Sequence, residues 1–278
     1  YEDMLADEQR MLRYRKAIES SVKPGDVVAD LGTGLGVLAM MAVQAGAKHV
    51  YAIDCRPQVM PITQKIINDN GMQDAITLIC ADARKVKLNV QVDLILNELI
   101  GDFGTDENIA ECVEQFALQH LKPQGRVLPE SLTTYLVPVM YGDEYKGIWR
   151  DDFHQLDMRG VAEIPCKEEA QMLLLTQPVT ELATPAIIES IDFNLRNQTR
   201  PLQHQVSFNI EKTGVLQGIM GFFKSRLAAD VSIDNYPGYP GCHWQTWHWP
   251  IYPQKALQPG QSLSVCLNTP ENMVAPQW

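Results

Sequence analysis

The sequence predicts an α/β protein in which a doubly wound parallel sheet is followed by an antiparallel β-barrel domain. Three observations lead to this prediction. Apolar runs of strand length alternate with helix-length segments up to Leu128, which is typical of βαβ units. The turn after the first apolar run carries three closely spaced glycines. Beyond Pro129 the pattern changes to short alternating runs between turn residues, which favours antiparallel strands.

The first half contains the predicted βαβ elements in order. Apolar periodicity indicates the helices, and Pro24-Gly25, Gly46 and Asn70-Gly71 mark their ends or the turns that follow. The expected helices are 2–22, 37–44, 60–70 and 109–120, and the expected strands are 27–29, 49–53, 76–79 and 92–96.

The second half carries the antiparallel pattern, with strands expected at 133–138, 205–210, 215–223 and 263–267. The stretch at about 149–185 fits neither pattern. It includes a segment with partly helical character at 167–175, and it reads as an insertion or an oligomerisation arm. We therefore expect two domains, 1–128 and 129–278.

Composition excludes several classes of protein. The chain has 278 residues and a net charge of −11, and both halves are acidic, so no basic surface for nucleic acid is expected. The six cysteines lack the paired spacing of a zinc site, and no apolar run has the length of a membrane span. Scattered cysteines favour a reducing compartment, the cytoplasm or the nucleus. Because the sequence begins at Tyr1 rather than Met, we expect it to be part of a longer chain.

A glycine loop follows the first predicted strand. Asp30 ends the strand, and Gly32, Gly34 and Gly36 follow at alternate positions. Glycines allow a tight turn and a close approach of the backbone to a ligand. A dinucleotide fingerprint places its third glycine one position later, where this chain has Val37. The spacing instead resembles motif I of class I S-adenosylmethionine methyltransferases.

Two further acids end the next two predicted strands. Asp54 is placed to accept the two ribose hydroxyls of a nucleoside, and Asp82, followed by Ala83, is placed to meet an adenine amino group. Ligands of such sheets bind at the carboxyl ends of the strands, so the three strand ends form one predicted site. The alternative is a glycine turn with ordinary surface acids.

The segment after the fourth predicted strand carries two glutamates, Glu98 and Glu107. On one continuous helix they would face opposite sides, but Gly101 and Gly104 favour a loop that folds back and brings them together. Two carboxylates in one pocket repel each other unless a cation binds. A planar guanidinium matches such a pair because it donates several N–H groups and stays charged. The alternative is a solvated acidic loop.

At this point the chain resembles the protein arginine methyltransferases. Glu98 and Glu107 resemble the family's double-E loop, in a version closest to the symmetric-dimethylating branch. The segment 1–10 is similar to its N-terminal helix, and His243-Trp244 resembles its Thr-His-Trp loop. The resemblance implies S-adenosyl-L-methionine as cofactor, bound by Tyr1, Met4, Arg10, Asp30, Gly32, Gly34, Gly36, Asp54, Asp82 and Ala83.

The resemblance also implies an activity, methyl transfer from S-adenosylmethionine to a guanidino nitrogen of arginine in a protein or peptide. Glu98 and Glu107 would hold the guanidinium, while Asp7 and His243 would pair as a proton acceptor or as a structural strut. Trp244 and Met4 would line the arginine channel. The family's dimerisation arm would lie at about 149–185, which predicts a homodimer.

Two other functions stay open at this stage. The same chemistry would serve a methyltransferase for a small guanidino compound. A non-catalytic module could also retain the fold, although the joint presence of Glu98, Glu107, Asp54 and His243 argues against a decayed site.

Overall fold

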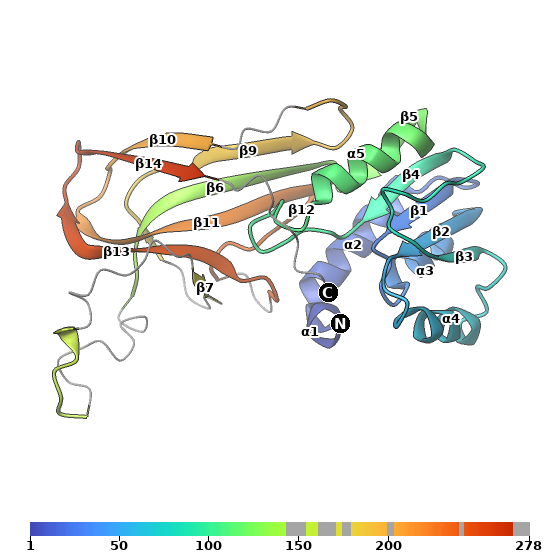
Figure 1. Cartoon of the computed structure of the whole chain (residues 1–278), viewed down its shortest axis with the longest axis horizontal. Helices are drawn as coiled ribbons and strands as arrows, with labels where there is room; N and C mark the ends of the chain where they lie inside the picture. Colours follow the sequence, from blue (N-terminus) through green and yellow to red (C-terminus); the bar gives the residue numbers. More distant parts are fainter. Residues whose placement is uncertain (143–153, 161–170, 174–178, 199–202, 239–241, 269–278) are drawn as a thin grey trace.

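The computed structural model describes residues 1–142, 154–160, 171–173, 179–198, 203–238 and 242–268. A parallel sheet with its helices forms one end of the molecule, and antiparallel strands form the other (Figure 1). The N-terminal helices lie between these two parts (Figure 1). None of the helices in the described ranges is long and apolar enough to cross a membrane.

The parallel sheet has the strand order β3-β2-β1-β4-β5. The chain runs outward from β1 through β2 to β3, then returns to the other side of β1 for β4 and β5. The order therefore reverses between β1 and β4, which is where open α/β sheets bind their ligands. The strands are β1 (Val27–Leu31), β2 (His49–Asp54), β3 (Ile76–Cys80), β4 (Val92–Asn97) and β5 (Leu121–Leu128).

The helices match the predicted segments with one correction. The expected helix 2–22 is two helices, because Asp7 interrupts it and caps the second one: its Oδ1 accepts a hydrogen bond from the Arg10 backbone N–H at 2.9 Å. The strand β5, which starts where the last helix ends, is an element that the sequence pattern did not predict. The helices are α1 (Glu2–Ala6), α2 (Glu8–Ser21), α3 (Val37–Gln44), α4 (Met60–Asp69) and α5 (Ile109–His120).

The antiparallel part begins after Pro129, whose preceding peptide bond is cis. Within the described residues, a seven-stranded sheet has the order β7-β13-β11-β6-β8, with β12 beside β11 and β9 beside β6, and β10 pairs with β14. The strands are β6 (Ser131–Met140), β7 (Gln171–Leu173), β8 (Thr180–Glu181), β9 (Ala186–Asp192), β10 (Gln203–Asn209), β11 (Gly214–Ala228), β12 (Val231–Asp234), β13 (Thr246–Leu257) and β14 (Ser262–Asn268).

The four strands expected in this half fall within β6, β10, β11 and β14. The helical character expected at 167–175 is wrong for Gln171–Leu173, because this segment pairs with β13 as an extended strand. Residues 167–170 and 174–175 lie outside the described residues, as does much of the expected arm at 149–185.

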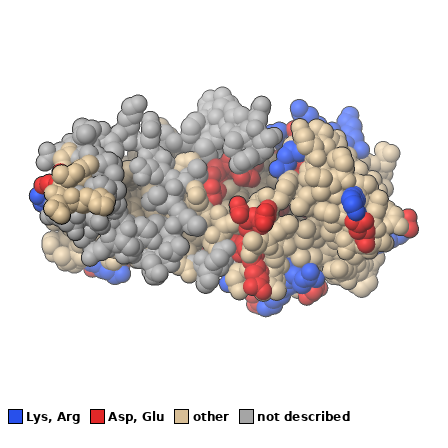
Figure 2. All heavy atoms as spheres, turned by 90° about the horizontal axis from the view of Figure 1, so that it is seen from below, with Lys and Arg blue, Asp and Glu red and all other residues tan. Residues whose placement is uncertain are grey.

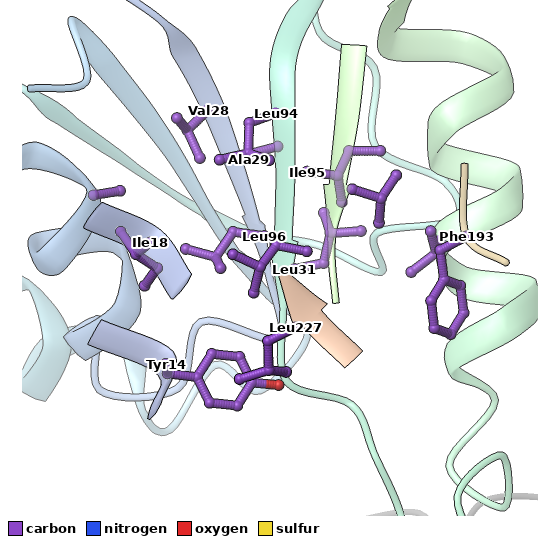
Figure 3. Packing of buried hydrophobic residues seen from close by; sticks show 14 of the residues in the cluster. Tyr14, Ile18, Val28, Ala29, Leu31, Leu94, Ile95, Leu96, Phe193 and Leu227 are labelled. Carbon is purple, nitrogen blue, oxygen red and sulfur yellow. The ribbon is translucent and has the colours of Figure 1, made fainter. Parts of the chain in front are cut away.

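One hydrophobic cluster joins the two parts of the molecule. It contains Leu31 and Leu96 from the parallel sheet, Tyr14 from α2, and Leu227 from β11. These side chains point toward one another in Figure 3. Because apolar surface from both parts is buried in one cluster, separating them would expose it to water, and this fixes their relative position.

We expect Leu96→Ala to destabilise the protein by about 2–5 kcal/mol, because the side chain is fully buried and its removal leaves a cavity. Urea denaturation measures the change. Leu118→Ala is the control, since Leu118 is 60% exposed on α5 and its truncation should cost no more than about 0.5 kcal/mol. Equal losses in the two variants would contradict the assignment of Leu96 to the core.

Candidate functional site

The glycine loop connects β1 to α3 and lies at the switch point of the sheet. Gly32, Gly34 and Gly36 all have positive φ angles, of 73°, 52° and 77°, in the left-handed region that favours glycine. A Cβ atom on Gly34 would lie only 2.7 Å from Cε1 of Tyr1. The loop therefore offers bare backbone to a ligand, with the Tyr1 ring close against it.

Asp30 lies buried beneath this loop. Its Oδ2 accepts a hydrogen bond of 2.6 Å from the Thr33 hydroxyl, and its Oδ1 has no partner among the described residues. Burial raises the pKa of Asp30 to about 7, against the lowering effect of the hydrogen bonds from Thr33 and Ala39. Asp30 therefore holds Thr33, and with it the glycine loop, in place through this hydrogen bond.

Asp54 and Asp82 lie at the ends of two adjacent strands, β2 and β3. Asp54 is buried, and its Oδ2 accepts a hydrogen bond from the Gly34 N–H at 2.9 Å. Its Oδ1 accepts the Arg56 backbone N–H at 3.0 Å. Asp82, which precedes Ala83, is more exposed, and the side-chain hydrogen bonds from Arg84 lower its pKa. Both carboxylates thus face the same edge of the sheet as the glycine loop.

The segment after β4 folds back as a hairpin. Gly101 and Gly104 exchange two backbone hydrogen bonds of 3.0 Å, and a Cβ on Gly101 would lie 2.0 Å from Oδ1 of Asp106. Any larger residue at that position would force the Asp106 side chain to move. The turn brings Glu98, at its start, near Glu107, at its end. Burial raises the pKa of Glu107 to about 7, and the charge of Glu98 is the second cause.

Arg10 of α2 engages one of the two glutamates. Its Nη2 forms an ion pair with Oε2 of Glu98, and its Nη1 donates to the Met4 carbonyl at 2.8 Å. Its Nε is buried and has no partner within the described part of the chain. Burial alone would lower the pKa of Arg10, but the charge of Glu98 raises it, and the net result is a raised pKa. Glu98 is therefore ion-paired with a cation of the chain, whereas the charge of Arg56 only partly offsets the rise in the pKa of Glu107.

His243 and Asp7 form a pair across the junction of the two parts. Oδ2 of Asp7 lies 3.2 Å from Nδ1 of His243 and accepts the His243 backbone N–H at 3.3 Å. Asp7 is 1% exposed. Burial lowers the pKa of His243, although the hydrogen bond to Asp7 acts in the opposite direction. The imidazole is thus oriented by Asp7 and is neutral near pH 7.

Trp244 is buried rather than open to a channel. Its Nε1 donates a hydrogen bond of 2.9 Å to the Ile100 carbonyl in the hairpin. Its ring packs at 5.2 Å from that of Phe223, and the Arg10 guanidinium carbon lies 5.7 Å from it. These contacts within the chain are enough to fix the position of the Trp244 ring. Its contact with a substrate side chain therefore stays a prediction.

Two residues that join the site to the antiparallel part escaped sequence analysis. Oδ1 of Asp102 accepts the Gln245 backbone N–H at 2.7 Å, and Asn235 donates to the Asp102 carbonyl at 2.8 Å. The sequence around Asn235, Asp-Asn-Tyr-Pro, carries only the signal of a turn. Nothing in it indicates a partner more than a hundred residues earlier.

Aspartate and glutamate side chains gather in the middle of the face shown in Figure 2. Among the described residues, no group of three or more histidine, cysteine, aspartate or glutamate side chains is placed to hold a metal ion. An acidic surface raises the local concentration of cationic molecules.

Comparison with known proteins defines the class first. Residues 15–128 match the family of ribosomal protein L11 methyltransferase (PrmA). The parallel sheet and its glycine loop therefore have the class I methyltransferase fold.

The particular resemblance is to protein arginine N-methyltransferases. The chain is 35% identical over 198 residues to protein arginine N-methyltransferase 1 of Dictyostelium discoideum, which is 69% of this chain and 55% of that protein. It thus spans about half the length of this curated relative. The likeness to the arginine methyltransferase family that the motifs predicted is confirmed.

Solved structures show the same fold. The Trypanosoma brucei PRMT1 enzyme–prozyme heterotetrameric complex with AdoHcy matches 96% of this chain and 86% of that chain, with a TM-score of 0.76 at 22% identity. Arabidopsis thaliana protein arginine methyltransferase 10, in an open conformation, matches 98% of this chain and 88% of that chain, with a TM-score of 0.80 at 20% identity. The predicted fold class is confirmed.

The raised pKa of Glu107 predicts a pH-dependent stability. Between about pH 4.3, where an unfolded glutamate ionises, and about pH 7, the folded protein keeps a proton that the unfolded chain has lost. The stability contributed by Glu107 therefore falls as pH rises through this window. We expect Glu107→Gln, which cannot ionise, to gain stability relative to wild type from pH 5 to pH 7.5.

Thermal unfolding of both proteins across this range measures the effect. Leu118→Ala is the control, because it changes no ionisable group and should keep a constant offset from wild type. A difference between Glu107→Gln and wild type that does not vary with pH would show that Glu107 ionises normally.

Proposed function

We propose that this protein transfers a methyl group from S-adenosyl-L-methionine to a guanidino nitrogen of arginine in protein or peptide substrates. The observation that supports the proposal is the hairpin after β4, on which the charge of Glu98 contributes to the raised pKa of Glu107 and Leu99 lies against Gly32 of the glycine loop. Residues 1–128 would form the donor-binding domain, and residues 129–278 the substrate domain with the arm at about 149–185. The acidic face in Figure 2 supports a cationic substrate.

The residues of the site fit the methyl donor. Asp54 would hold the ribose hydroxyls, and Asp82 with Ala83 the adenine. The unpartnered Nε of Arg10 supports a role in binding the donor's carboxylate. Asp30, Gly32, Gly34 and Gly36 would cradle it, and Tyr1 and Met4 would cover it. When bound, the donor supplies an electrophilic methyl group on a positively charged sulfur.

The two glutamates would activate the guanidinium. Its nitrogen lone pairs are delocalised, so an unassisted guanidinium is a poor nucleophile. Hydrogen bonds from its N–H groups to Glu98 and Glu107 would concentrate positive charge on the bound nitrogens and fix the orientation of the reacting one. Glu107 must be ionised for this role, and a cationic substrate would lower its raised pKa.

His243 would act on the product. The methylated nitrogen loses a proton, and a neutral imidazole held by Asp7 is suited to accept it. The same hydrogen bond also supports the reading of the pair as a strut between α2 and the 242–245 loop. Trp244 and Met4 would line the channel for the arginine side chain.

The assembly and location of the protein are further parts of the proposal. We propose a homodimer formed through the arm, since the similar Trypanosoma brucei enzyme is described as part of a heterotetramer. A reducing compartment is proposed because the cysteines in the described ranges are free thiols.

Mass spectrometry of an arginine-rich peptide incubated with the protein and S-adenosylmethionine tests the activity, and free arginine serves as the competing substrate. We expect Glu98→Gln to lower methyl transfer by about 10²–10³-fold, because it removes a charged group of the clamp. Donor affinity, measured by titration calorimetry, should fall far less than turnover, because glutamine keeps a side-chain oxygen that can accept a hydrogen bond from Arg10. Glu211→Gln, at an exposed turn of the antiparallel part, is the control. Full turnover by Glu98→Gln would remove the clamp from the mechanism.

Asp54→Ala tests the donor site separately. Loss of the carboxylate removes the proposed ribose contact and the hydrogen bond to Gly34, so we expect the donor to bind at least about tenfold more weakly. Calorimetric titration with S-adenosylmethionine measures this. Asp69→Ala, at an exposed position of α4, should bind the donor as wild type does. Identical affinities for the two variants would refute the ribose assignment.

A further inference from the structure

Asn235 lies just after β12 and is almost completely buried, with 3% of its surface exposed. Its side-chain amide makes three hydrogen bonds of 2.8 Å, and each involves the backbone of a different segment. Nδ2 donates to the Asp102 carbonyl and to the Gln245 carbonyl, while Oδ1 accepts the Phe223 N–H. Both N–H donors of the amide and one acceptor position of its oxygen are thus used within the chain itself.

The three segments have distinct places in the site. Asp102 belongs to the hairpin that carries Glu98 and Glu107. Gln245 follows His243 and Trp244 directly. Phe223 belongs to β11, the strand with the longest span in the antiparallel sheet. One side chain therefore connects the hairpin, the His-Trp loop and the rigid sheet behind them.

Two more hydrogen bonds join the same hairpin to the same loop. Gln245 N–H donates to Oδ1 of Asp102 at 2.7 Å, and Nε1 of Trp244 donates to the Ile100 carbonyl at 2.9 Å. Both run directly between the two loops, and neither of these two bonds involves β11. Packing contacts such as Trp244 on Phe223 also reach β11, and Asn235 adds a directional hydrogen bond to it through the Phe223 N–H.

We infer that Asn235 is a positioning residue, which sets the hairpin with Glu98 and Glu107 in register with the loop that carries His243. This inference rests on the proposed function, because it assigns the two loops a joint role in methyl transfer. The three hydrogen bonds of the Asn235 side chain involve neither glutamate and none of the residues at the ends of β1 and β2. Its loss should therefore affect the reaction step and leave donor binding intact.

The chemistry requires an amide at this position. Aspartate has the same shape and would keep an oxygen that accepts the Phe223 N–H. It would, however, replace the NH2 group, which donates to two carbonyls, by an oxygen that faces those carbonyl oxygens. Alanine would leave two buried carbonyls and one buried N–H without their partner, which costs stability as well as order. Both variants lose the link between the loops, by different routes.

The experiment compares Asn235→Ala, Asn235→Asp and Ser225→Ala with wild type. Ser225 is the matched control, because it is fully buried on β11 and donates one hydrogen bond, of 2.9 Å, to the Ser131 carbonyl, away from both loops. We expect kcat for peptide methylation to fall by about 10²-fold in both Asn235 variants, as a misplaced catalytic group would cause. The Kd for S-adenosylmethionine should stay at its wild-type value, and Ser225→Ala should retain the wild-type kcat.

Hydrogen–deuterium exchange gives a readout that is independent of activity. Backbone amides in 98–107 and 242–246 should exchange faster in Asn235→Ala than in Ser225→Ala, while 27–54 should exchange equally in both. The exchange measurement still tests the positioning role if the wild-type protein methylates no arginine peptide. That result would overturn the proposed function but not the positioning role. Wild-type kcat in Asn235→Asp, or equal exchange of both loops in Asn235→Ala and Ser225→Ala, would overturn the positioning role.

Discussion

The ion pair between Arg10 and Glu98 is the interaction on which the site depends. Two glutamates lie close together on one hairpin, and their charges repel each other. Arg10 pairs with Glu98 from α2, whereas burial, with the charge of Glu98 as the second cause, raises the pKa of Glu107 to about 7. The hairpin therefore combines an acid that is already paired with Arg10 and an acid whose pKa is raised. An arriving cation would favour ionisation of the second.

The position of this hairpin is set by both parts of the molecule. Its start follows β4 in the parallel sheet, and its tip is hydrogen-bonded to the loop before β13 through Asp102 and Trp244. The shared hydrophobic cluster holds the two parts together beneath these polar contacts. Since apolar packing is not directional, it brings the parts together but leaves the loops free to shift. The buried hydrogen bonds supply the orientation that packing lacks.

Much of this arrangement was predictable from the sequence. The alternation of strands and helices gave the parallel sheet, because its buried strands are apolar and its turns contain Gly and Pro. The glycine loop and the acids Asp54 and Asp82 were found because each is next to a strand end. The break at Asp7 was missed, since helical periodicity continues on both sides of it. Asn235 could not be found, because its partner in the hairpin, Asp102, is distant in the sequence and a turn asparagine has no distinctive pattern.

Asp7 has an evolutionary consequence. One of its oxygens caps α2 and the other binds both the backbone and the ring of His243. Asparagine would place an N–H group toward one of these donors, and glutamate would move both oxygens about one methylene away from the cap. Neither of its nearest chemical relatives can serve both ends, so the residue has no neutral single-step replacement. Substitutions at Asp7 are therefore constrained by His243, which lies in a loop more than two hundred residues later in the sequence.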